Sequence, residues 1–233
     1  MTTATVPAAR TMIMTLAGVT LTRLGRGKAL WIAAVFSALP LIYAVLAHSG
    51  RFLFEASTQF GISSLLLAVL PAMFVGASVG EEIEDRTSTY LWSRPIARWV
   101  VLAGKLLALT PIVVVLLVGG WYLEARLASN AGPPVASIIA LAAGTIASSL
   151  AVAGIAVVVP KHGTALTIAY MLVDLFIGAM PFSMRALSMT YQVRTMAGMG
   201  DEPQAYVAPA IAMAVLAGIW LAIGVVRIRR LEV

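Results

Sequence analysis

The chain has 233 residues, of which 61% are apolar and 11% are charged. A soluble domain carries about 25% charged residues, so this composition excludes a water-soluble globular enzyme. There is no cysteine and there are two histidines, which excludes disulfides and cysteine chemistry and disfavours a histidine-rich metal site. The net charge of +6 gathers at the ends of apolar runs, which favours a membrane surface over nucleic acid.

The first 28 residues are predicted to lie on the membrane surface. Arg10 and Arg23 enclose twelve uncharged residues, which are too few to cross a bilayer. Apolar residues recur at helical spacing from Ala9 to Val19, and no small-residue cleavage site of a signal peptide follows them. We therefore expect an amphipathic interfacial helix over residues 1–28, with a frayed cytoplasmic tail as the alternative.

Six apolar runs then meet the length rule for a transmembrane helix. They cover residues 29–47, 61–80, 100–123, 135–159, 163–180 and 206–226. The prediction is an all-α polytopic membrane protein, with residues 1–233 forming one transmembrane domain.

The basic residues are distributed unequally between the two sides that six spans would create. The side of both termini holds twelve of the sixteen, namely Arg10, Arg23, Arg26, Lys28, Arg86, Arg94, Arg98, Lys105, Lys161, Arg227, Arg229 and Arg230. Because basic loops stay inside, this bias predicts that both termini are cytoplasmic.

The connection from Pro181 to Pro203 is predicted to form an outer helix before the sixth span. Apolar residues recur there at alternating intervals of four and three, which is typical of one helix face: Phe182, Ala186, Met189, Val193 and Met196. The segment is too polar to cross, so it should lie in the outer interface or enter and return packed against protein.

Residues 81–105 contain the most specific pattern. Four acids, Glu81, Glu82, Glu84 and Asp85, directly follow the second span. Two residues after Asp85 a Thr-Ser pair can cap a short helix, and Pro95 can end it. The pattern predicts a charged element at the membrane surface that docks a cytoplasmic partner, and a solvated loop is the alternative.

This segment resembles the cytoplasmic loop of the permease subunits of type-2 ABC exporters. In that family an acidic end of the second span leads through a threonine, a leucine-rich turn and a proline–arginine step to a Gly-Lys pair. The matching positions here are Glu81 or Glu82, Thr87-Ser88-Thr89, Leu91, Pro95-Ile96-Ala97-Arg98 and Gly104-Lys105. The sequence departs from the family pattern at Arg86, which replaces a frequent glycine, and at Leu91-Trp92, which replaces a double leucine.

The resemblance implies one half of an exporter in the bacterial inner membrane, with a second permease chain, identical or paralogous, and separate ABC-type ATPases as partners, besides membrane lipid. The loop would form a coupling helix that docks the ATPase through Glu81, Glu82, Glu84, Asp85, Arg86, Leu91, Arg94, Pro95 and Arg98. The chain has no Gly-x-x-x-x-Gly-Lys-Ser/Thr loop, so it would not hydrolyse ATP. No cofactor or metal is expected on it, since ATP and Mg²⁺ would bind the partner.

Asp174 is the only acid within the expected spans. An acid in a membrane usually faces protein or a water-filled cavity. One interpretation places Asp174 and Tyr170 in a translocation pathway for a cationic or polar substrate. The other is a carboxyl hydrogen-bonded to Tyr170 or to a neighbouring helix. Lys105 is expected to extend to the inner interface.

Two other function classes remain open. A membrane scaffold could use the same loop to recruit a partner without transport. An intramembrane enzyme is the weaker alternative, because it would need a serine–histidine pair or two aspartates at matching depth.

Overall fold

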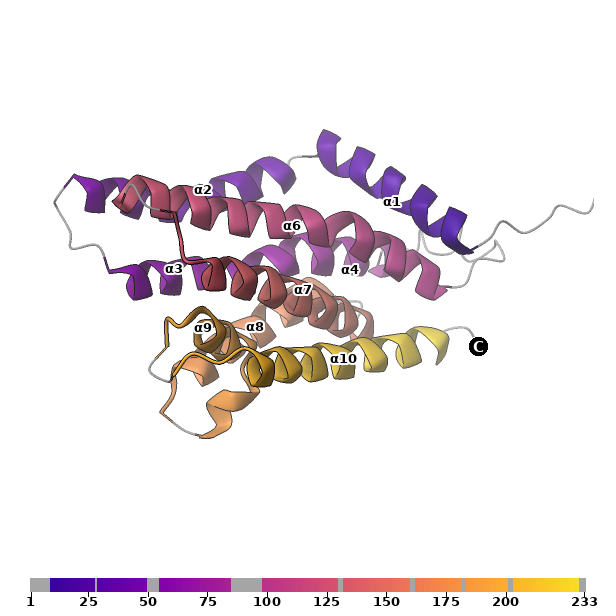
Figure 1. Ribbon diagram of the computed structural model, residues 1–233. Helices are drawn as coiled ribbons and strands as arrows, with labels where there is room; N and C mark the ends of the chain where they lie inside the picture. Colours follow the sequence, from indigo (N-terminus) through magenta and orange to yellow (C-terminus); the bar gives the residue numbers. More distant parts are fainter. Residues whose placement is uncertain are drawn as a thin grey trace, which may run out of the picture.

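A computed structural model describes residues 9–27, 29–49, 55–84, 98–129, 132–159, 162–181, 183–200 and 203–230, and every regular element in them is helical (Figure 1). The elements are α1 (Ala9–Arg26), α2 (Ala29–His48), α3 (Ala56–Pro71), the π-helix η1 (Ala72–Gly76), α4 (Ala77–Glu84), α6 (Arg98–Ser129), α7 (Val135–Val158), α8 (Gly163–Ala179), the 3-10 helix η3 (Ser183–Leu187), α9 (Met189–Ala197) and α10 (Val207–Arg230). The all-α prediction is confirmed for these residues.

Five of the described stretches are long and apolar enough to cross a membrane: Leu30–His48, Ala56–Gly80, Trp99–Ser129, Val135–Val158 and Val207–Ile228. The fifth predicted span corresponds to α8, an apolar helix of 17 residues. At 1.5 Å per residue α8 is about 26 Å long, a little less than the ~30 Å of a hydrocarbon core. The chain is therefore a multi-pass membrane protein, with five spans supported by length and composition.

Two helices extend beyond the predicted spans. The apolar helical stretch over the second span begins at Ala56, before residue 61, and the one over the third continues to Ser129, beyond residue 123. The predicted spans end at polar residues, and the fold buries some of these. Gln59 in α3 and Glu124 in α6 are both 0% exposed.

The bundle has two ends that differ in their contents (Figure 1). At one end lie α1 and the last residues of α10, and we call it the terminal end. At the opposite, distal end lie the last residues of α2 and α6 and the first residues of α3 and α7, together with η3 and α9. Helix α7 is central, since α3, α6, α8, α9 and α10 all pack against it.

Helix α1 packs against α6 where α6 carries a glycine. A Cβ on Gly104 would lie 3.0 Å from Leu16 Cβ and 3.2 Å from the Ile13 carbonyl oxygen. Ala17 is buried, whereas Val19, Leu21 and most of the remaining surface of α1 are exposed. A helix over the N-terminal segment is thus confirmed from Ala9 to Arg26, and residues 1–8 lie outside the described part.

Glycines also bring α7 and α10 into backbone contact. A Cβ on Gly224 would lie 2.7 Å from Gly154 Cα, and a Cβ on Gly154 would overlap the Trp220 carbonyl oxygen. Such glycine pairs allow helix backbones to approach closely in membranes. Neither position leaves room for a larger residue unless the two helices separate.

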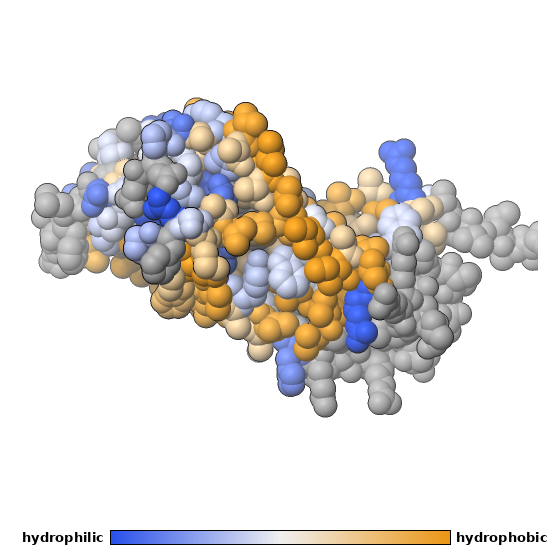
Figure 2. All heavy atoms as spheres, turned by 90° about the horizontal axis from the view of Figure 1, so that it is seen from below, coloured by the Kyte–Doolittle hydropathy of each residue, from blue (hydrophilic) through white to orange (hydrophobic). Residues whose placement is uncertain are grey.

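Apolar side chains cover much of the outer surface. Figure 2 shows them across the middle of the face viewed from below, with hydrophilic residues gathered toward its left side. Exposed apolar residues follow one side of α10: Val207, Ile211, Val215, Ile219, Ile223 and Val226. So large an exposed apolar surface is expected of a protein surrounded by lipid.

Candidate functional site

The predicted docking segment begins as a direct continuation of a span. Glu81, Glu82 and Glu84 belong to α4, which extends past the end of the apolar stretch Ala56–Gly80. Arg98 is the first residue of α6. Asp85, Arg86, Leu91, Arg94 and Pro95 fall outside the described residues, so their docking role stays a prediction. The end of α4 and the start of α6 both lie at the terminal end (Figure 1).

Lys105, which was expected to extend to the inner interface, is buried between helices in the structure. Its side chain is 4% exposed, and its Nζ donates a hydrogen bond to the backbone carbonyl of Ser78. The reason is that α1 covers α6 at the neighbouring Gly104, while α4 offers a carbonyl acceptor on the other side. Lys105 therefore joins α6 to α4 just before the acidic run.

Asp174 is buried, with 4% of its surface exposed, and its carboxylate accepts four hydrogen bonds. Oδ1 accepts from the Met189 backbone N–H at 2.7 Å. Oδ2 accepts from Ser188 Oγ at 3.1 Å, from the Thr190 N–H at 3.0 Å and from Thr190 Oγ1 at 2.7 Å. All the donors belong to the start of α9, where helix N–H groups have no intrahelical partner and favour an anion.

The partner of Asp174 is thus the neighbouring helix. Tyr170, one turn before it on α8, instead accepts a hydrogen bond from Trp220 Nε1 at 3.0 Å. The two rings pack edge to face with centroids 5.2 Å apart. Tyr170 therefore joins α8 to α10, and Asp174 joins α8 to α9. A role of either residue in a translocation pathway stays a prediction.

The outer segment is two helices rather than one. Helix α9 begins after Ser188, whose Oγ accepts from the Tyr191 N–H at 3.1 Å, and it ends at Gly198 with φ of 69°. Met189, Val193 and Met196, from the predicted apolar face, are buried, and so are Gln192 and Thr195, which lie outside that face. The reason is that α7, α8 and α10 all pack around α9. Helix α9 thus packs against protein, and its placement relative to the membrane stays a prediction.

A second buried acid, Glu124, is not identified from the sequence. Its Oε2 accepts hydrogen bonds from Gln59 Nε2 at 2.9 Å and from Ser63 Oγ at 2.5 Å. Gln59 Nε2 also donates to the Pro40 carbonyl at 3.2 Å. The group therefore links α2, α3 and α6 toward the distal end. Two features of the sequence could have indicated it. Gln59 and Ser63 are spaced so that they share one face of a helix, and the apolar run of the third span stops at an acid, Glu124.

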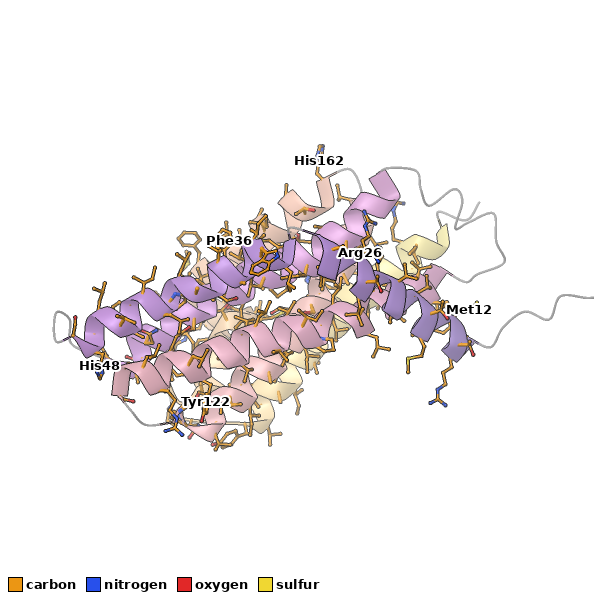
Figure 3. The ribbon with its side chains drawn as sticks, turned by 90° about the horizontal axis from the view of Figure 1, so that it is seen from above. Met12, Arg26, Phe36, His48, Tyr122 and His162 are labelled. Atoms are coloured by element: carbon orange, nitrogen blue, oxygen red, sulfur yellow. The ribbon has the colours of Figure 1, made fainter. Side chains whose placement is uncertain are left out.

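The described residues hold no cluster of three or more histidine, cysteine or acidic side chains that could bind a metal ion. His48 and His162, the only histidines of the chain, lie far apart (Figure 3). His48 and Tyr122 both lie toward the left of Figure 3, and Met12 lies toward the right. The geometry of the described residues thus offers hydrogen-bonded carboxylates between helices.

No protein-family model matches this chain, and no curated protein sequence matches it. The resemblance to exporter permeases therefore depends on residues 81–105 and on the arrangement of helices around them.

Proposed function

We propose that this chain is the permease subunit of a type-2 ABC exporter, with ATP hydrolysis on a separate chain. The observation that supports this most is the position of the acidic run. Glu81, Glu82 and Glu84 extend a helix beyond an apolar span, at the end of the bundle that also holds α1 and the C-terminal end of α10. A cytoplasmic ATPase docked at the terminal end would meet this run first.

The proposed topology has six spans, with α8 as the short fifth one and both termini in the cytoplasm of a bacterial cell. The described ends of the chain lie on the same side of the bundle, as an even number of crossings requires (Figure 1). The segment with η3 and α9 then lies on the outside. A second permease chain would complete the transporter.

The contacts of α4 suggest how docking would influence the spans. Lys105 joins α4 to α6. Gly76, at the end of the π-helix, closely approaches α8, since its Cβ would lie 2.9 Å from Thr167 Oγ1. Pro71 precedes that π-helix and has no N–H to continue the regular pattern. A push on the acidic end would therefore reach α6 directly and α8 through η1, which is the kind of helix shift that a two-state transporter needs.

A matched pair of charge reversals tests the docking surface. Glu84→Lys and Glu55→Lys change the charge equally, but Glu84 ends α4 at the terminal end whereas Glu55 precedes α3 at the distal end. Tagged protein is purified from its native membranes in mild detergent, and the ATPase that accompanies it is measured. We expect Glu84→Lys to reduce copurified ATPase several-fold, and the reversal of Glu81, Glu82, Glu84 and Asp85 together to abolish it.

Glu55→Lys should leave the complex intact. If the quadruple reversal retains a stoichiometric ATPase, the docking surface is wrong. If the complex forms but substrate does not change its ATP hydrolysis, the chain is a scaffold rather than a permease.

A further inference from the structure

The surroundings of Glu124 contain oxygen atoms without donors. Both hydrogen bonds to its carboxylate end on Oε2, and within the described part of the chain Oε1 has no hydrogen-bond partner. The same holds for Gln59 Oε1, on the amide group whose Nε2 binds the carboxylate, and for Ser37 Oγ on α2. Gln59 and Glu124 are both 0% exposed, and Ser37 is 7% exposed.

The free carboxylate oxygen of Glu124 and the backbone of Ser37 both lie close to a glycine. A Cβ on Gly120, one turn before Glu124 on α6, would lie 3.8 Å from Glu124 Oε1 and 3.7 Å from the Ser37 carbonyl oxygen. Gly120 therefore places no side chain between the free carboxylate oxygen and α2. The local chemistry consists of a carboxylate, an amide oxygen, a hydroxyl and a carbonyl, all of which accept hydrogen bonds or bind cations.

A buried carboxylate with this environment lacks compensation for its charge. Taking a carboxylate out of water costs several kcal/mol unless cations or enough hydrogen bonds replace the water. The donors to Glu124 are two uncharged side chains. The nearest basic residue along the helix, Arg126, is exposed and donates to the Tyr122 hydroxyl at 3.2 Å.

The other titratable groups of the packed elements do not supply the charge either. On α2 these are Tyr43, which is partly buried, and His48, which is exposed, and ahead of α3 there is Glu55, also exposed. Tyr122 on α6 is exposed as well. Glu55 accepts hydrogen bonds from its own neighbours Ser57 and Thr58. None of these groups is a positively charged partner for Glu124 in the described contacts.

We infer that Glu124, together with Gln59 and Ser37, forms a binding site for one small monovalent cation between α2, α3 and α6. The cation is either a proton carried by the carboxyl or an alkali ion such as Na⁺, since oxygen atoms are the ligands that hard cations prefer. The inference concerns the bundle itself and does not depend on the proposed transport function.

A hydrophobic carbodiimide provides the test, because it modifies protonated carboxyl groups in apolar surroundings. The full-length protein in lipid nanodiscs is treated with the reagent, in sodium chloride or in choline chloride at equal ionic strength, and the modified residues are mapped by mass spectrometry. Asp174 is the internal control, because it is also a buried acid but accepts hydrogen bonds on both carboxylate oxygens. Thermal unfolding is recorded in the same two salts.

If the cation is a proton, Glu124 is labelled in both salts and Asp174 is not, and Glu124→Gln loses the label. If it is Na⁺, sodium protects Glu124 from labelling and raises Tm by about 5 °C, a shift that Glu124→Gln abolishes. Both labelling patterns are read on the unaltered chain, so they stand even if the variant does not fold. Absence of Glu124 labelling together with absence of sodium stabilisation would overturn the inference, as would equal labelling of Asp174.

Discussion

Asp174 and Glu124 make a matched comparison between two regions of the bundle. Each lies five residues before the end of its own helix, 174 before 179 and 124 before 129, and each is almost fully buried. Asp174 accepts hydrogen bonds on both oxygens, two of them from backbone N–H groups at the start of α9. Glu124 accepts two, both on one oxygen and both from side chains. The comparison shows two environments for a buried acid. Asp174 accepts hydrogen bonds from the free N–H groups at the start of a helix, whereas one oxygen of Glu124 has no donor among the described residues.

The largest expected effect comes from removing the carboxylate of Asp174, on which both oxygens accept hydrogen bonds. Asp174→Ala leaves two backbone N–H groups and two hydroxyls at the start of α9 without their acceptor. We expect a loss of about 3–5 kcal/mol in the free energy of unfolding, because breaking a buried charged network leaves its partners unpaired. The measurement is unfolding in mild detergent monitored by circular dichroism, with limited proteolysis of residues 183–200. An unchanged midpoint and unchanged cleavage would show that α9 does not depend on Asp174.

A smaller effect is expected at the other acid. Glu124→Ala leaves Gln59 Nε2 with the Pro40 carbonyl and leaves Ser63 Oγ with the Gln59 carbonyl, to which it is 3.1 Å away. The destabilisation should therefore be about 1–2 kcal/mol, less than at Asp174. The double variant Glu124→Leu with Gln59→Leu should be close to the unaltered protein or more stable, since apolar replacement of a poorly compensated group is often neutral. A larger loss for Glu124→Ala than for Asp174→Ala would reverse the comparison.

The contribution of Ser188 can be separated from that of Asp174. Ser188 caps α9 through Tyr191 and also donates to Asp174. Replacing a capping serine by alanine costs about 1 kcal/mol, so Ser188→Ala should destabilise the protein by that amount. In the Asp174→Ala background the cost should be smaller, because one of the two hydrogen bonds of Ser188 is already lost. A double-mutant cycle that gives strict additivity would contradict the shared network.

The smallest effect concerns an exposed acid at the start of α3. Hydrogen bonds from Ser57, and then from Thr58, lower the pKa of the Glu55 carboxyl below its ordinary value of 4.5. Because the pKa is lower in the folded state, these hydrogen bonds stabilise the fold above pH 4.5. Their contribution to the free energy of unfolding is lost as the pH falls through the lowered pKa. Because Glu55 is exposed, the change in stability with pH should be slight. The measurement compares the unfolding midpoint of the unaltered protein with that of Glu55→Gln at pH values from 7 to 3. A midpoint difference that grows as the pH falls would contradict the sign.

The sequence predicted the helical class and the position of most apolar helices, because long uncharged runs can hardly be anything else in a chain of this composition. It singled out Asp174 as an acid within an apolar run but left two partners open, since choosing between Tyr170 and another helix requires the packing of α8 against α9. Glu124 was missed because hydropathy treats an acid as the end of a span. Whether a polar residue can be buried depends on donors elsewhere in the chain, here Gln59 and Ser63, which lie more than sixty residues earlier.

The backbone contact between Gly154 and Gly224 has a mechanical consequence. Where Gly154 meets Gly224 no side chain separates α7 from α10, so moving the two helices apart would break a direct backbone contact. Helices α7 and α10 would move as one unit during any rearrangement of the bundle, and α9 would move with them, since it packs on both. A shift that begins at α4 and α6 would then occur relative to this unit.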